Sequence, residues 1–373
     1  MNTVDWLDKP YYSLNAYFKH TYGQKIYKIA VDAGLTCPNR DGSLDDRGCI
    51  FCSAGGSGDF AVKLTDYDSP YHLQYDRGSV QNRGRVDGET NESVSQARQV
   101  ISVKRQIERG MARFNKRVGE RFVIYFQAYT NTYGDIRYLR DIWTAALESE
   151  QVVGISIATR PDCLGFGNEP WQEQCKGVLA LLTELKNIYE PQGKFVWVEL
   201  GLQTIHEKTA AYIRRGYPLA VYDEAVKRLS ACGIPYITHI ILGLPGETRE
   251  MMLDTVRYVN AGHPFGVKLQ LLHVLKGTEL AEDYRTGAFR VMDMEEYIAL
   301  VMESLEYISR EVVIHRVTGD GPKNILLAPE WSGNKRMVLN TLHRRMREEG
   351  RKQGIKCQLH YHPQNDTYHN SDD

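Results

Sequence analysis

The sequence predicts an α/β fold built on a parallel β-sheet. Short runs rich in Val, Ile, Leu and Tyr alternate with longer segments of helical character. This alternation is typical of parallel strands joined by right-handed crossovers. Six such strand–helix units form either an open doubly wound sheet or a partial barrel. In both folds the active site lies at the carboxyl ends of the strands.

The expected strands are short and apolar, as strands buried on both faces are. They are residues 25–31, 121–127, 152–158, 195–201, 235–242 and 267–274. The segments with helical character between them are residues 93–116, 136–150, 171–189, 219–231 and 249–259. Clusters of polar residues fall just after the strands, which agrees with a site at that end of the sheet.

The chain divides into three expected parts around this sheet. Residues 1–24 form an N-terminal extension, residues 25–322 the barrel, and residues 323–373 a basic C-terminal helix with a polar tail. Residues 53–91 are long, polar and glycine-rich for a connection, so we expect an inserted loop. This loop is a substrate-facing excursion, a mobile lid or a disordered linker.

The bulk properties favour a cytoplasmic protein with no membrane partner. No apolar run approaches the roughly 20 residues that span a bilayer. Residues 1–10 are too polar for a signal peptide. The net charge of −1 gives no sign that the molecule as a whole binds nucleic acid.

Three of the seven cysteines lie in one loop after the first expected strand: Cys37, Cys49 and Cys52. Clustered cysteines in a long chain without a signal peptide indicate metal binding or chemistry rather than disulfides. Ordinary iron–sulfur clusters use four thiolates, so three would leave one iron of a 4Fe–4S cluster open to an external ligand. The alternative is a zinc site completed by a histidine or an aspartate.

Further motifs accompany this loop. Eleven residues separate Cys37 from Cys49, and Phe51 precedes the last cysteine. The later motifs are Ala-Thr-Arg-Pro-Asp at 158–162, Val-Glu-Leu-Gly-Leu-Gln-Thr at 198–204, Gly-Leu-Pro-Gly-Glu at 243–247 and Lys-Gly-Thr at 276–278. Together they resemble the Elp3-like radical S-adenosylmethionine (SAM) proteins of the YtqA/YhcC type, over roughly residues 12–350.

The resemblance implies a fold, two cofactors and a reaction type. The fold is a partial (βα)6 TIM-like radical SAM barrel with N- and C-terminal extensions. The cofactors are a 4Fe–4S cluster on the three cysteines and SAM, whose amino and carboxylate groups bind the open iron. A one-electron reductant such as flavodoxin or ferredoxin is an implied partner. Reductive cleavage of SAM yields a 5′-deoxyadenosyl radical that removes hydrogen from an unactivated carbon.

Eight further residues are candidates for binding the cofactors. Glycine lets the backbone approach a ligand closely, and polar residues after a strand can reach it. A carboxylate in an apolar strand, such as Glu199, is either functional or paired with a nearby cation. A helix start is the alternative explanation of the 243–247 motif, although its position after a strand favours the cofactor. The candidates are Gly55, Gly56, Thr130, Asn131, Glu199, Gln203, Gly243 and Leu244.

The resemblance also implies a substrate, the wobble uridine of tRNA. Relatives of this type suggest conversion of 5-carboxymethylaminomethyluridine to 5-aminomethyluridine. The substrate carboxylate then needs a cation, for which Lys268, Arg160 and Arg316 are the candidates, although a structural pair of Arg160 with Asp162 is equally consistent. Period two places Lys268 on one strand face and His273 on the other.

Transfer RNA also needs contacts to its phosphates, and two basic segments could supply them. Solvated helix faces are the plain alternative. The C-terminal segment contains Lys335, Arg336, Arg344, Arg345, Arg347, Arg351, Lys352 and Lys356. The other segment contains Lys104, Arg105, Arg109, Arg113, Lys116 and Arg117.

Two other functions remain open from the sequence. One is a radical SAM enzyme that acts on a peptide or small molecule, with the same cluster and turnover without RNA. The other is a zinc-stabilised RNA-binding adaptor without catalysis. The second would contain one zinc ion and would not cleave SAM.

Overall fold

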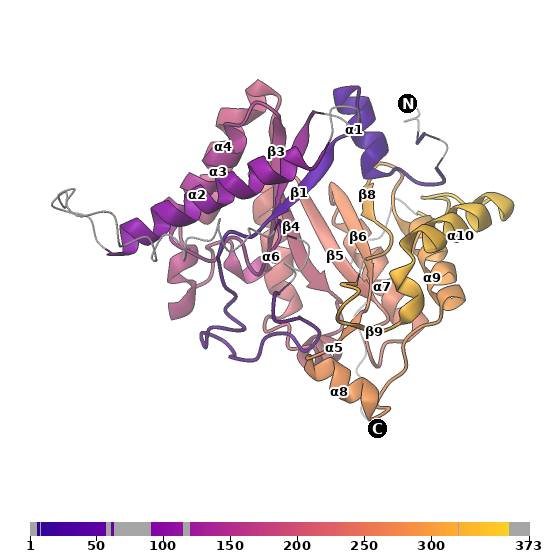
Figure 1. The fold of residues 1–373 in the computed structure, drawn as a ribbon. Coiled ribbons are helices and arrows are strands. Elements are labelled where there is room, and N and C mark those ends of the chain that lie inside the picture. The colour runs from indigo at the N-terminus through magenta and orange to yellow at the C-terminus, as the bar shows by residue number, and fades with distance from the viewer. Residues whose placement is uncertain are drawn as a thin grey trace.

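A parallel sheet of seven strands lies at the centre of the computed structural model, in the order β1-β2-β3-β4-β5-β6-β8 (Figure 1). The structure describes residues 6–7, 9–56, 61–62, 91–114, 120–319 and 321–357. The strands are β1 (Tyr27–Val31), β2 (Phe122–Phe126), β3 (Val152–Thr159), β4 (Phe195–Gln203), β5 (Tyr236–Leu242), β6 (Gly266–Leu271) and β8 (Val313–Arg316).

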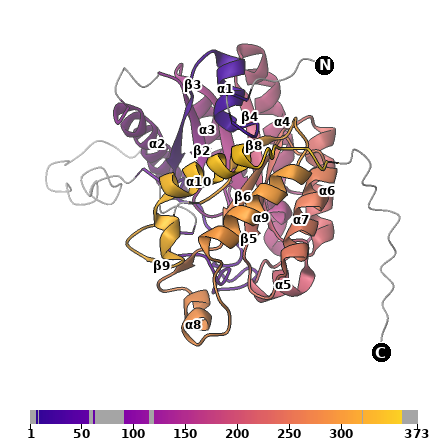
Figure 2. The ribbon, with the colours of Figure 1, turned by 90° about the vertical axis from the view of Figure 1, so that its right-hand side faces the viewer.

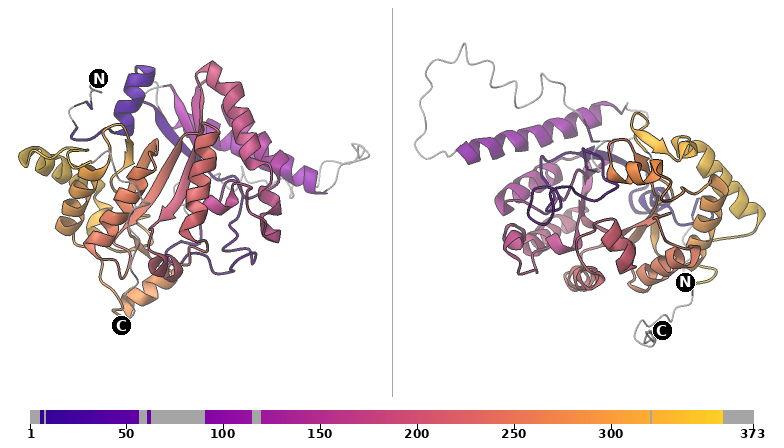
Figure 3. Two further views of the ribbon diagram at one scale, coloured as in Figure 1. Left: turned by 180° about the vertical axis from the view of Figure 1, so that it is seen from behind. Right: turned by 90° about the horizontal axis from the view of Figure 1, so that it is seen from below.

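Helices cover the outer face of this curled sheet (Figures 2 and 3). They are α2 (Asn91–Ala112), α3 (Ile136–Leu147), α4 (Val178–Tyr189), α6 (Leu219–Ala231), α7 (Arg249–Ala261) and α9 (Met294–Tyr307). Smaller elements are α1 (Leu14–Tyr22), α5 (Glu207–Tyr212), β7 (Val274–Leu275), α8 (Glu279–Arg285), β9 (Leu326–Ala328) and α10 (Lys335–Glu348). The predicted α/β partial barrel is confirmed.

Two details of the sheet differ from the sequence prediction. The expected strand 267–274 is two strands: β6 ends at Leu271, and Val274 begins β7, which pairs antiparallel with β9. The seventh strand, β8, was not predicted. It has only four residues, and half of them, His315 and Arg316, are polar. A strand so short and polar carries no apolar run that would reveal it.

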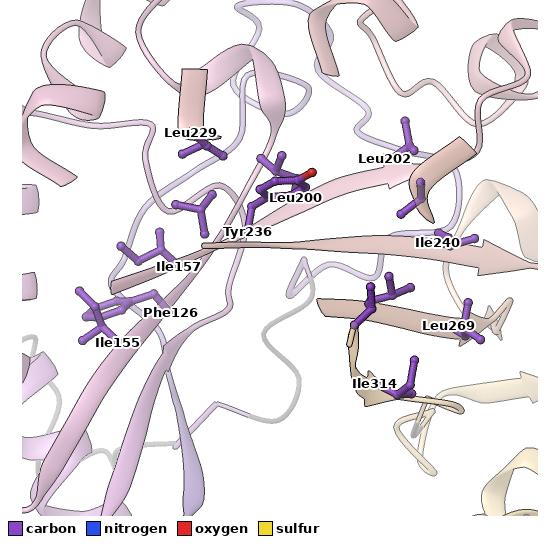
Figure 4. Close-up of a cluster of buried hydrophobic side chains, with 14 of the residues drawn as sticks. Phe126, Ile155, Ile157, Leu200, Leu202, Leu229, Tyr236, Ile240, Leu269 and Ile314 are labelled. Atoms are coloured by element: carbon purple, nitrogen blue, oxygen red, sulfur yellow. The ribbon is translucent and has the colours of Figure 1, made fainter. Parts of the chain in front are cut away.

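The alternation of side chains along the strands separates the core from the site. On β4, Val198 and Leu200 belong to the main apolar core, whereas Glu199 between them points to the opposite face. Leu229 of α6 and Tyr236 of β5 belong to the same core (Figure 4). The outer face of the sheet therefore packs on helices, and the inner face is left for polar side chains.

An aromatic cluster lies at the amino ends of the strands, the end of the barrel opposite the cysteine loop. Phe18 of α1 stacks on Trp197 of β4 with ring centroids 5.9 Å apart and an interplanar angle of 9°. Val123 and Ile237 from neighbouring strands complete this cluster. The barrel is thus filled at this end, which leaves its carboxyl end for a ligand.

The chain segments before β1 and after β8 meet. The buried Gln353 accepts a hydrogen bond from the backbone N–H of Tyr12 (2.8 Å) and donates to the carbonyls of Ser309 and Val312 (2.6 and 2.9 Å). Met346 of α10 lies in the main core. Both segments therefore pack on the barrel, and the domain boundaries at 24/25 and 322/323 stay predictions.

Candidate active site

A cavity of about 270 Å³ lies within the curl of the sheet. Its lining includes most of the site residues predicted from the sequence. They are Cys37, Cys49, Cys52, Gly56, Thr130, Arg160, Glu199, Gln203, Lys268 and Arg316. The other predicted residues are not in the lining: Gly55, Asn131, Gly243 and Leu244. The fold therefore brings segments from the whole barrel to one place.

Polar contacts fold the wide cysteine loop so that all three thiols reach this cavity. The guanidinium of Arg40 donates to the carbonyls of Cys52 and Ser53 (3.0 and 2.7 Å). Asn39 donates through its side-chain amide to the carbonyl of Arg214 (2.7 Å) and to the sulfur of Cys49 (3.5 Å). The eleven residues between the first two cysteines are therefore held by the loop's own side chains and by the α5–α6 connection.

The thiols differ in their readiness to ionise. A hydrogen bond between Cys49 and Cys52 lowers the pKa of the Cys49 thiol to about 6. Burial raises the pKa of Cys37, although the charge of Arg160 opposes this. Because the thiolate is the form that binds metal, Cys49 is poised as a ligand at neutral pH.

This donor set fits a 4Fe–4S cluster. In the described part of the chain, no three His, Cys, Asp or Glu side chains form a group compact enough for one metal ion. A cluster does not require such a group, because each of its cysteines binds a different iron. Cys37, Cys49 and Cys52 all line one cavity and supply soft thiolate ligands, which suit an iron–sulfur cluster with one open iron.

The inner wall of the cavity is organised around the carboxylate of Glu199, which is fully buried. It accepts hydrogen bonds from Lys28 (3.0 Å), Ser156 (2.6 Å) and His239 (2.7 Å), and it pairs with Lys268. Burial alone would raise the pKa of Glu199, but the charges of Lys268 and Lys28 hold it well below its usual range. The carboxylate is therefore ionised and fully paired.

A bulge at the end of β4 directs another polar group at the site. Gln203 adopts the left-handed backbone conformation (φ 65°), where the register with β5 shifts. A side chain at Gly201 would come within 2.8 Å of the Gln203 amide nitrogen, so the glycine makes room for it. The Gln203 Oε1 atom is buried with no hydrogen-bond partner among the described residues. Such an acceptor indicates a place for a ligand donor.

Arg160 and Asn131 make structural contacts. Arg160 pairs with Asp162 through two hydrogen bonds (2.9 and 2.7 Å) and donates to the carbonyl of Arg215 (2.8 Å). Asn131 donates to the carbonyls of Ala128 and Ala158 (3.0 and 3.1 Å), which fixes the end of β2 against β3. Both residues hold strand ends in place, and the role of Arg160 toward a substrate stays a prediction.

The glycine motifs support the cysteine loop. A side chain at Gly56 would come within 2.9 Å of the ring of Tyr129, whose hydroxyl donates to the carbonyl of Ala54 (2.7 Å). Leu244 is buried in an apolar cluster with Ile50, one of the two residues between Cys49 and Cys52. Gly243 adopts a positive φ of 91° that favours glycine. These contacts position the loop after the cysteines.

One orientation predicted from the sequence is wrong. His273 was expected on the strand face opposite Lys268 and Gln270, but all three line the cavity. The period of two ends with β6 at Leu271, so it no longer governs the side chain of His273. Other expectations lie outside the described residues: most of the 53–91 loop, Lys116, Arg117 and the polar tail beyond 357.

Sequence reasoning missed several residues at this site. Lys28 and His239 bind Glu199, and the hydroxyl of Tyr125 accepts from Lys268 (3.0 Å). Lys28 and His239 each interrupt an apolar strand, which is the signal that singled out Glu199, so the same test would have found both. Tyr217 lies on an irregular connection, and nothing in its surroundings in the sequence indicates that it lines the cavity.

Comparison with known proteins decides the family. The model described as "Radical SAM superfamily" matches residues 46–259, and the "Radical_SAM C-terminal domain" matches residues 264–348. The chain belongs to the radical SAM superfamily. This family uses a 4Fe–4S cluster and SAM, so the predicted cofactors are confirmed at the level of the family.

Individual relatives show which proteins within the radical SAM superfamily this chain resembles. The Bacillus subtilis protein YtqA is 37% identical over 348 residues, which cover 93% of this chain and 92% of YtqA. The Methanocaldococcus jannaschii tRNA uridine(34) acetyltransferase is 28% identical over 163 residues, 43% of this chain and 29% of that protein. The predicted resemblance to Elp3-like proteins of the YtqA/YhcC type is thus confirmed.

A solved structure supports the radical SAM fold. The Methanocaldococcus infernus Elp3 with an N-terminal deletion superposes with a TM-score of 0.52 at 20% identity, covering 68% of this chain and 60% of that one.

In the part of the chain that the structure describes, no helix has the length and apolar character to cross a membrane.

The network around Glu199 predicts a pH dependence of stability. Burial and the charge of Lys268 lower the pKa of His239 to about 4, from an ordinary value near 6.5. Between these values the unfolded chain binds a proton that the folded one does not. Stability should therefore fall as the pH drops from 6.5 to 4, by up to about 1.4 kcal/mol per pH unit.

The variant His239→Asn keeps an amide donor but does not titrate. Urea unfolding at a series of pH values should give a flatter profile for this variant than for the wild type between pH 6.5 and 4. Equal slopes in the two proteins would show that His239 is not held neutral by its surroundings.

Proposed function

We propose that this protein is a tRNA-modifying radical SAM enzyme that converts 5-carboxymethylaminomethyluridine at the wobble position to 5-aminomethyluridine. One observation carries the proposal: a single cavity joins three cysteines to a wall of cationic and amide side chains. A relative whose name refers to uridine 34 of tRNA supports the substrate class. Cytoplasmic tRNA and a one-electron reductant such as flavodoxin or ferredoxin are the proposed partners.

The residues of the cavity have distinct tasks in this reaction. Cys37, Cys49 and Cys52 would hold the 4Fe–4S cluster, which would supply the electron for reductive cleavage of SAM. The Glu199 network keeps the inner wall rigid, because its polar contacts tie β4 to four other strands. The Gln203 Oε1 atom, which is buried and unpartnered in the described structure, is available to a ligand amine. Preorganised groups of this kind orient reactants without further reorganisation.

The proposed substrate places a weak C–H bond between two functional groups. The methylene between the amine nitrogen and the carboxylate loses a hydrogen atom, and the resulting carbon radical is stabilised by both neighbours. Loss of one electron to a one-electron acceptor, such as the oxidised form of the proposed flavodoxin or ferredoxin, and of one proton then gives an imine. Water adds to the imine and the C–N bond breaks, which leaves 5-aminomethyluridine and releases glyoxylate.

Ion pairs within the protein weaken the prediction that the C-terminal segment binds tRNA phosphates. In the C-terminal segment, Arg344 pairs with Glu348, Arg345 with Glu295, and Lys356 with Glu306. These pairs reduce the positive charge that α10 offers to phosphates.

Helix α2 is the better candidate for phosphate contacts. Its Lys104 and Arg105 are exposed, as is Arg113 just after its last residue. Gln106 on the same helix binds both backbone groups of Asp32 (2.8 and 2.7 Å), at the start of the cysteine loop. The basic face of α2 is therefore fixed to the segment that leads into the site, and Figure 3 (right) shows α2 along that side of the barrel.

The cluster and the reaction are tested together in anaerobically reconstituted protein. We expect about four irons per chain, 5′-deoxyadenosine with SAM and dithionite, and 5-aminomethyluridine in hydrolysed tRNA that carried the longer group. The Cys49→Ala variant should lose the cluster and both products, because two thiolates cannot hold it. Stoichiometric zinc without a brown chromophore would establish the adaptor alternative instead, and turnover of peptides without RNA the other one.

The proposed contact between α2 and tRNA is tested by measuring how the affinity for tRNA depends on salt concentration. If α2 neutralises phosphates, log Kd should change linearly with log salt concentration, with a slope of roughly 0.9 per contact for a duplex. The double variant Lys104→Glu, Arg105→Glu should weaken binding and lower this slope. Lys227→Glu on α6, also exposed, is the matched control and should leave both unchanged. Equal slopes for the double variant and the wild type would exclude α2 as the contact.

A further inference from the structure

The charges that line the cavity are strongly unbalanced. Among the described lining residues, Glu199 is the one carboxylate. The cationic side chains in the same lining are Arg40, Arg160, Arg215, Lys268 and Arg316. A buried charge is costly unless it is paired or hydrogen-bonded, so the partner of each cation determines whether it can bind a ligand.

Four of these cations have their donors engaged. Arg160 pairs with Asp162, and Lys268 pairs with Glu199. Arg215 donates to the carbonyls of Thr204 (2.6 Å) and Tyr217 (2.9 Å) and pairs with Glu207, and the Arg40 guanidinium holds two carbonyls of the cysteine loop. They support the walls of the cavity.

Arg316 is different. In the described structure it has no ion pair or hydrogen bond to its side chain, although it lines the same cavity. Its position in the sheet is fixed: it is in register with Lys268 of β6, which is in register with His239 of β5 and, through it, with Gly201 of β4. Residues in register share one face, so the row runs along the inner wall.

Arg316 is the residue of this row that can bind a ligand. The Gln203 amide takes the space over Gly201, and Lys268 and His239 both bind Glu199. Glu199, the one carboxylate among the described lining residues, already binds these groups and Lys28, so it does not also neutralise Arg316. Among the described residues no acid is therefore left for the guanidinium of Arg316, which is available to a ligand.

We infer that Arg316 is the group that binds the substrate's carboxylate, and that neither Lys268 nor Arg160 does so. This inference rests on the proposed function and names the recognition element of the same site. A guanidinium presents two parallel donors that match a carboxylate, and a charge-assisted pair is stronger than a hydrogen bond to a neutral group. The enzyme thus selects tRNA whose wobble side chain ends in a carboxylate.

The test compares two tRNA substrates that differ by one charge. One carries the natural carboxymethylaminomethyl group, and the other carries its carboxamide analogue. Reconstituted wild-type enzyme should prefer the acid by roughly tenfold or more in kcat/KM. In Arg316→Gln this preference should fall to near one, and Arg316→Lys should retain part of it. Arg137→Gln, an exposed arginine on α3, is the matched control and should keep the full preference.

Iron content per chain and the far-ultraviolet circular dichroism spectrum report whether the variants fold and hold the cluster. Both should be the same in wild type, Arg316→Gln and Arg316→Lys. If Arg316→Gln keeps the preference for the acid, Arg316 does not bind the substrate carboxylate. If wild-type enzyme converts neither tRNA, the proposed function fails instead, and the two failures are thereby distinguished.

Discussion

The buried carboxylate of Glu199 is the constraint on which the site depends. An isolated charge at this depth would be very costly, so the strands around β4 must each supply a partner. Lys28 comes from β1, Ser156 from β3, His239 from β5 and Lys268 from β6. The network therefore holds the strands of the inner wall together. It also pairs Lys268 with Glu199, so this lysine is not available to bind the substrate.

The two ends of the barrel differ in character, because the side chains change from aromatic to polar along the strands. At the amino ends of the strands, Trp197 and Phe18 fill the interior with stacked rings. Two residues further along β4, Glu199 begins the polar section, and Gly201 and Gln203 then open the cavity toward the cysteines. Strand β4 thus contributes in turn to the aromatic cluster, to the charged inner wall and to the bulge that faces the cavity.

Much of this could be predicted from the sequence, because buried parallel strands leave long apolar runs and clustered cysteines leave a spacing. Glu199 stood out as a carboxylate within such a run. The partners of a charge are harder to predict: the pairing of Lys268 with Glu199 depends on strand register, which joins residues 69 positions apart in the chain. The position of His273 depended on where β6 ends, and β8 was too short and polar to be recognised.

The most direct test of the account follows one hydrogen atom. The substrate is tRNA in which the methylene between the amine and the carboxylate of the wobble group carries deuterium. The account predicts that 5′-deoxyadenosine formed by the reconstituted enzyme gains deuterium while 5-aminomethyluridine and glyoxylate appear. Deuterium-free 5′-deoxyadenosine, formed while the tRNA stays unchanged, would contradict the account and direct attention to a peptide or small-molecule substrate.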